Sequence, residues 1–156
     1  MAKHEAKLYE QDYYAWTQHQ AAALRDLATA RWNGPLDLDH LASEVQASGS
    51  EQHAAAASHL TRLIEHLLKL ATSPSLAPRR RWRLSVRRSR SELHRRLGLT
   101  LRNKLEAELA DTYADAREAA AVGLLQHGED AAAALPETRP WTMEEMLERG
   151  WYPGEG

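Results

Sequence analysis

The sequence predicts an all-α protein. Its 156 residues include 27 Ala and 23 Leu, but only 3 Val, 1 Ile and no Phe. Helices tolerate alanine and leucine best, whereas strands favour β-branched and aromatic side chains. A chain of this length can bury one core, so we expect a single helical bundle over residues 1–156. We place its core at about residues 8–122 and a C-terminal strap at about residues 136–153.

Apolar side chains that recur every three or four residues predict the first helices. The first covers Leu8–Arg31, and Asn33-Gly34-Pro35 ends it because proline cannot continue a helix. Asp37 is a suitable N-cap for a second helix. The apolar face of that helix comprises Leu38, Leu41, Ala42 and Val45.

Ser48-Gly49-Ser50 either breaks or kinks the chain before a third helix at Glu51–Ala71. The core stripe of this helix comprises Leu60, Leu63, Ile64, Leu67, Leu68 and Ala71. A fourth helix at Arg81–Leu97 follows a turn with two prolines, and Gly98 ends it. Its narrow apolar face comprises Trp82, Val86, Leu93 and Leu97. We therefore expect Trp82 to point into the core.

A fifth helix covers Leu101–Val122, with its apolar stripe at Leu105, Leu109, Tyr113, Ala116 and Ala120. Residues 131–134 form either a helical turn or a linker. Residues 136–140 form an extended spacer. Thr142 and Glu145 then have the spacing of a capping box for a short last helix. The prediction is thus about five helices and a short C-terminal one.

Composition also excludes several kinds of site. Cysteine is absent, which excludes disulfides, zinc–thiolate sites, iron–sulfur clusters and a cysteine nucleophile. The first residues lack the apolar segment of a signal peptide, and no apolar run approaches the roughly 18 residues of a membrane span. We expect a cytoplasmic protein that does not bind membranes.

The net charge of −2 hides a strong asymmetry. Residues 79–104 contain eleven Lys or Arg and a single acid, Glu92. Any attraction to a polyanion must therefore be local. The candidate binding residues on the fourth helix are Arg83, Arg87, Arg88 and Arg95. They favour contact with nucleic-acid phosphates or with a protein partner. The alternative is a solvated helix whose arginines pair with acids elsewhere in the chain.

Several short blocks occur in a characteristic order. They are Leu8-Tyr9-Glu10-Gln11-Asp12 with Trp16, Leu38-Asp39-His40-Leu41 with Glu44, His66-Leu67-Leu68-Lys69, Trp82 with Arg87 and Arg90, Tyr113-Ala114-Asp115-Ala116-Arg117, and Pro136-Glu137-Thr138-Arg139-Pro140-Trp141. In this order the sequence resembles bacterial domain-of-unknown-function family twenty-nine over roughly residues 8–153. The resemblance implies a helical bundle and supplies no catalytic residue.

Ionisable residues of these blocks form a second candidate set, namely Asp12, Asp37, Glu44, His66, Arg87 and Arg90. Most such sets are ion pairs and hydrogen bonds that fix the register of helices, so we expect Asp12, Asp37, Glu44, His66 and Arg90 to form a buried polar network. The alternative is a hydrolase site that uses Asp12, Glu44 and His66.

The eight histidines provide no metal-binding signature, because neither Glu-x-x-His nor His-Glu-x-x-His occurs. We read His40 and Glu44 as an i, i+4 surface pair, and His59 and His66 share one helix face. The spacing of Arg88 and His94 is similar to the Arg–His spacing of the HEPN family of helical ribonucleases. That resemblance implies a metal-independent ribonuclease as an alternative function.

The sequence thus favours a non-enzymatic interaction module without a metal or cofactor. Its partner would be a protein or a nucleic acid, and homo-oligomerisation is open.

Overall fold

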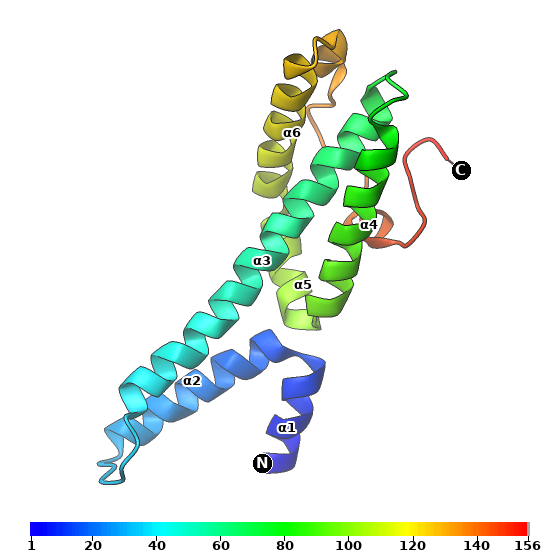
Figure 1. Cartoon of the computed structure of the whole chain (residues 1–156). Coiled ribbons are helices and arrows are strands. Elements are labelled where there is room, and N and C mark those ends of the chain that lie inside the picture. Colours follow the sequence, from blue (N-terminus) through cyan, green and yellow to red (C-terminus); the bar gives the residue numbers. More distant parts are fainter. Residues whose placement is uncertain (156) are drawn as a thin grey trace. The chain divides into compact units, whose positions relative to one another are not determined.

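The computed structural model describes residues 1–155, and every regular element in that part of the chain is helical (Figure 1). The elements are α1 (Ala2–Gln11), α2 (Tyr13–Thr29), α3 (Leu38–Thr72), α4 (Arg79–Arg96), α5 (Leu99–Ala107), α6 (Leu109–Gln126), the 3-10 helix η1 (Asp130–Ala134) and α7 (Met143–Leu147). The all-α class is confirmed. The described residues form seven α-helices rather than about five and a short one, because two of the predicted helices are each divided in two and two others are joined into α3.

The chain divides into two compact units. The first consists of Met1–Ala55 and Leu97–Lys104, and the second consists of Ala56–Arg96 and the residues from Leu105 onward. Helices α3 and α5 contribute residues to both.

Asp12 organises the first unit and divides the predicted Leu8–Arg31 helix. Its side chain is 8% exposed, and its backbone leaves the helical conformation with φ −148° and ψ 76°. Oδ1 accepts a hydrogen bond from the Ala15 amide at 3.1 Å, and Oδ2 accepts one from the Thr100 amide at 2.9 Å. One buried carboxylate therefore caps both α2 and α5, since the first amides of a helix lack partners within it.

Gly49 belongs to the interior of α3, so the predicted break at Ser48-Gly49-Ser50 is wrong. A Cβ atom at Gly49 would lie 2.2 Å from Oγ1 of Thr17 on α2. The neighbouring Ser48 shares a hydrogen bond of 2.7 Å with the Tyr13 hydroxyl. The small residues serve the close approach of two helices rather than a turn.

The core of the second unit follows the predicted stripes. Leu60, Leu63, Ile64, Leu67 and Leu68 of α3 are fully buried, although Ala71 is exposed. Helix α4 adds Trp82 at 6% exposure, together with Val86 and Leu93. The predicted stripe of the fifth helix is buried throughout, even though the helix is divided at Glu108 into α5 and α6. The inward position of Trp82 is confirmed.

Side chains of the second unit hold the C-terminal strap by its backbone carbonyls. Tyr113 Oη and Arg117 Nε donate to the Pro136 carbonyl at 2.7 and 2.9 Å. Arg90 Nε donates to the Met146 carbonyl at 2.8 Å, and Arg90 Nη2 donates to the Trp151 carbonyl at 2.6 Å. The segment follows α4 in Figure 1, and α7 is its one regular element.

The predicted capping box of α7 is confirmed. Thr142 Oγ1 accepts from the Glu145 amide at 3.1 Å, and the Glu145 carboxylate accepts from the Thr142 amide at 2.8 Å. Residues 130–134 take the helical alternative, as the 3-10 helix η1.

We expect Arg90→Ala to destabilise the second unit strongly. The change removes two hydrogen bonds from a charged donor that is 3% exposed, and such losses cost about 3 kcal/mol together. Thermal unfolding followed by circular dichroism should show a Tm lower by roughly 6–12 °C. The control is Arg88→Ala on the same helix, which should change stability by less than about 0.5 kcal/mol. Equal Tm values for the two variants would contradict a stabilising role for the hydrogen bonds from Arg90 to the strap.

Candidate functional site

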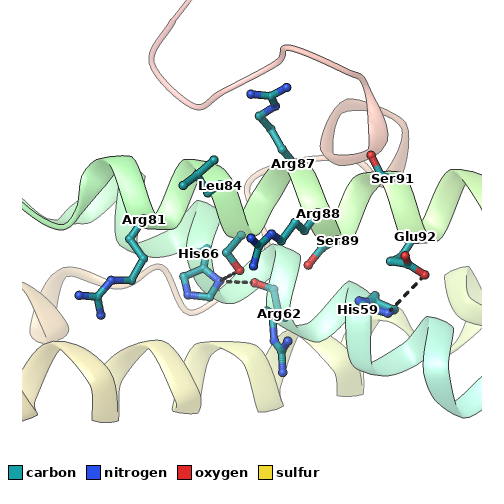
Figure 2. Close-up of a pocket in the computed structure, with 11 residues that line it drawn as sticks. His59, Arg62, His66, Arg81, Leu84, Arg87, Arg88, Ser89, Ser91 and Glu92 are labelled. Atoms are coloured by element: carbon teal, nitrogen blue, oxygen red, sulfur yellow. Dashed lines mark hydrogen bonds and ion pairs between the residues drawn. The ribbon is translucent and has the colours of Figure 1, made fainter.

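A hollow of the second unit lies along the Arg-rich helix α4 and has a volume of about 890 Å³. Figure 2 shows the residues that line it. Its charged and titratable members are Arg62, Arg81, Arg87, Arg88, His59, His66 and Glu92. We call this hollow the arginine groove. Four guanidinium groups and one carboxylate give it a positive charge.

Helical periodicity places these side chains together. On α3, Arg62 and His66 are four residues apart and lie outside the buried Leu63–Leu67 stripe. On α4, Arg81 and Arg88 are seven residues apart, so they share one face. Figure 2 shows His66 between Arg81 and Arg88, whereas Arg87 points from α4 away from His66. The groove therefore takes its cations from two helices.

His66 is fixed at the middle of the groove. Its Nδ1 lies 3.0 Å from the Arg62 carbonyl oxygen and 3.0 Å from the Ser85 hydroxyl. Because a carbonyl only accepts, the bond to Arg62 places the proton on Nδ1 and leaves Nε2 as the basic nitrogen. Burial lowers the pKa of His66. The carboxylate of Glu65 opposes this shift, whereas the positive charges of Lys69 and Arg62 act in the same direction as burial, and the net shift is downward. The ring is therefore neutral at pH 7.

Glu92 lies at one end of the groove and is already paired. Its carboxylate forms an ion pair with Arg95 and another with Arg96, the second at 3.3 Å. His59 Nε2 lies 4.0 Å from Oε2 of Glu92. Burial alone would raise the pKa of the Glu92 carboxyl, but these guanidinium groups lower it below its usual value. Burial also lowers the pKa of His59. The single acid of the groove thus offers little counter-charge to the other end.

The remaining arginines of the groove lack acidic partners. Arg62, Arg81, Arg87 and Arg88 are exposed, and none forms a side-chain hydrogen bond or ion pair with any residue of the described chain, 1–155. A guanidinium group in this state keeps five N–H donors available to oxyanions.

The four nominated arginines have different surroundings. Arg87 and Arg88 line the groove. Arg83 pairs with Glu155, and its guanidinium carbon lies 4.3 Å from the centre of the Tyr152 ring. Arg95 pairs with Glu92. Two of the four are therefore occupied by partners within the chain.

Arg88 and His94 have different surroundings as well. Arg88 lines the groove, whereas His94 Nε2 lies 2.7 Å from the Leu147 carbonyl and so donates to the strap. Its protonated Nε2 cannot at the same time accept a proton from a substrate.

The expected network of five buried polar residues requires a correction. Asp12 and Arg90 are buried and His66 is half-buried, but Asp37 and Glu44 are exposed. Asp37 instead caps α3 through the His40 amide, at 3.3 Å. The partners of Asp12 are backbone amides and those of Arg90 are backbone carbonyls. Hydrogen bonds to the backbone replace the expected ion pairs.

His40 also has a different partner from the one expected. Its Nδ1 lies 2.6 Å from Asp37 Oδ2, three residues earlier, rather than against Glu44. This pair raises the pKa of His40 and lowers that of Asp37, mainly through the side-chain hydrogen bond.

Sequence reasoning missed Arg62 and Arg81 as groove residues. Arg62 lies outside the basic segment, and only its position four residues before His66 indicated a shared face. No group of three or more His, Cys, Asp or Glu side chains suited to a metal ion occurs among the residues that the structure describes. Within the same range, no helix is both long and apolar enough to cross a membrane.

Comparisons with known proteins agree on the fold and name no activity. The family model described as "Domain of unknown function DUF29" matches residues 8–152. The structure is similar to the crystal structure of an α-helical protein of unknown function from Rhodospirillum rubrum, with a TM-score of 0.83 and 24% identity. The match covers 92% of this chain and 90% of that one. No curated protein matches the sequence.

We expect His66 to make stability depend on pH. Its pKa is lower in the folded chain than in the unfolded chain, so on acidification below about pH 6.5 the unfolded chain takes up a proton first. This contribution to stability is present above the unfolded pKa and is lost as the pH falls through the folded pKa. The Tm between about pH 7.5 and pH 5.5 should therefore fall less steeply for His66→Gln than for the unmodified chain.

The control for this measurement is His127→Gln, which changes an exposed histidine at the end of α6. It should keep the pH dependence of the unmodified chain. An unchanged slope in His66→Gln would show that His66 titrates alike in the folded and unfolded chains.

Proposed function

The chain belongs to the DUF29 family, and within that family framework we propose that the arginine groove binds the phosphate backbone of single-stranded nucleic acid, without catalysing a reaction. The observation that carries the proposal is the set of unpaired guanidinium groups of Arg62, Arg81 and Arg88 around one groove. Guanidinium groups bind phosphate oxygens in a bidentate manner, and their binding releases condensed counter-ions from the strand.

The position of the charge supports this choice of partner. The whole chain has a net charge of −2, so a polyanion would be attracted to the groove rather than to the surface in general. The groove has no aromatic residue in its lining, which favours contact with the backbone over stacking on bases. We therefore expect little dependence on base sequence.

The test is the salt dependence of binding to a labelled RNA. The probe is a fluorescein-labelled oligouridylate of about 12 nucleotides with a 5′-hydroxyl end, followed by fluorescence anisotropy between about 50 and 200 mM salt. Three arginine contacts predict a slope of log K against log salt of about −2, because each single-strand contact contributes about −0.7. Arg88→Gln should weaken binding about tenfold and reduce the slope by about 0.7.

The matched control is Arg80→Gln, which removes the same charge from the same helix at an exposed position outside the groove lining. It should leave both the affinity and the slope nearly unchanged. Equal losses in Arg80→Gln and Arg88→Gln, or equal affinity for a polyglutamate of matched charge, would contradict a nucleic-acid groove. The second result would identify an acidic protein segment as the ligand.

A specific observation favours RNA cleavage as a second candidate function. The basic Nε2 of His66 and the guanidinium groups of Arg81 and Arg88 share the groove. A neutral imidazole can accept the proton of a ribose 2′-hydroxyl while that oxygen attacks the adjacent phosphorus, and the departing 5′-oxygen takes a proton from water. The arginines would stabilise the charge that develops on the phosphate oxygens.

This second candidate predicts a slow cleavage that His66→Gln abolishes while RNA binding persists. The measurement is gel analysis of 5′-labelled RNA, with 2′-O-methyl RNA as the control because it lacks the attacking hydroxyl. Cleavage that survives in His66→Gln, or that also occurs with the methylated strand, would contradict the mechanism.

A further inference from the structure

A second pocket, separate in most of its lining from the arginine groove, lies where the strap turns past α4. It has a volume of about 390 Å³ and is lined by Arg87, Arg90, Ser91, Arg149, Gly150 and Tyr152. Its lining contains three arginines and no carboxylate. Figure 2 shows Arg87 and Ser91 on the side of α4 that faces away from His66. We call this hollow the strap pocket.

Arg90 is the buried member of the strap pocket. It is 3% exposed, and its Nε and Nη2 donate to the carbonyls of Met146 and Trp151. Its Nη1 is buried and has no hydrogen-bond partner. Carbonyl groups satisfy donors without neutralising the charge. The Arg90 guanidinium group thus keeps its positive charge and one unused donor without a carboxylate partner.

Neighbouring carboxylates form no ion pair with Arg90. Glu155 pairs with Arg83, and the charge of Glu148 raises the pKa of Arg90 without offsetting the burial that lowers it. The Tyr152 ring lies 5.3 Å from the guanidinium carbon of Arg90 and 4.3 Å from that of Arg83. A ring face attracts cations, but it accepts no conventional hydrogen bond from Nη1.

Arg87 and Arg149 add accessible cations at the mouth of the pocket. Both are exposed, and neither forms a side-chain hydrogen bond or ion pair with another residue in the range 1–155. Ser91 is also exposed and contributes a hydroxyl donor from the next turn of α4.

We propose that the strap pocket binds the dianionic phosphate group of a small phosphate monoester. Three guanidinium groups and a hydroxyl match the charge and the several acceptor oxygens of such a group better than they match a monoanionic carboxylate. The volume lies at the small end of the range for small-molecule pockets. It suits a compact phosphorylated molecule rather than a polymer.

Binding at this position would also fasten the strap. Arg90 holds two carbonyls of the strap, and Arg149, Gly150 and Tyr152 belong to the strap itself. A ligand that bridges Arg149 and Arg87 would connect the strap to α4 a second time. A ligand that binds only the folded state stabilises it by RT ln(1 + c/Kd), where c is the free ligand concentration, so Tm rises as c exceeds Kd.

The experiment titrates phenyl phosphate into the full chain by isothermal calorimetry and measures Tm in parallel. Phenyl sulfate is the matched ligand control, since it has nearly the same shape and only one negative charge. Inorganic phosphate is the second arm. We expect phenyl phosphate to bind at least as tightly as inorganic phosphate, about tenfold tighter than phenyl sulfate, and to raise Tm.

Arg149→Gln tests the pocket because the Arg149 side chain is exposed, and its loss leaves the hydrogen bonding of Arg90 to the strap in place. It should weaken phenyl phosphate binding about tenfold, whereas Arg80→Gln, outside the pocket, should leave it unchanged. Undetectable binding, equal weakening by both changes, equal affinity for phenyl sulfate, or binding of inorganic phosphate alone would each overturn the proposal.

Discussion

The second unit depends on guanidinium groups that bind backbone carbonyls. Arg90 bonds the carbonyls of Met146 and Trp151, and Arg117 bonds those of Leu135 and Pro136. The strap has little regular structure of its own, so its carbonyls would otherwise need water or would be buried without partners. A hydrogen bond to a charged donor is roughly twice as strong as a neutral one. These few contacts can therefore hold a segment in which the five residues of α7 are the one regular element.

This use of arginine has an electrostatic consequence. A carbonyl satisfies the donors of a guanidinium group but leaves its positive charge in place. The acids near α4 are few, and Glu92 and Glu155 are already paired with Arg95, Arg96 and Arg83. The arginines without an acidic partner therefore lie on two sides of α4. One side faces the arginine groove and the other faces the strap pocket. Both candidate sites follow from the same imbalance between cations and carboxylates.

Periodicity predicted the parts of the fold that depend on neighbours along one helix. It gave the buried stripes at Leu60–Leu68, Trp82–Leu93 and Leu105–Ala120, together with the capping box at Thr142. It did not predict the features that depend on distant residues. Asp12 divides a helix because its carboxylate also caps Thr100, 88 residues away. Gly49 lies inside a helix, and its missing side chain leaves the space that Thr17 occupies.

The same limit explains which site residues could be predicted. Counting charges identified α4 as the basic helix, and two of its four nominated arginines, Arg87 and Arg88, line the groove. It could not distinguish Arg83 or Arg95 from them, since their acidic partners are known only once the chain is folded. The sequence did indicate Arg90 as a buried polar residue, but not its partners, because backbone carbonyls belong to every residue and leave no signature in a sequence. The preference for arginine nevertheless has a physical basis. A lysine ammonium is a single point charge, whereas the planar guanidinium group of Arg90 reaches two carbonyls in fixed directions, and its Nη1 still has no partner. A chain with 16 Arg and 4 Lys thus has side chains that can hold a strap and still present donors to a ligand.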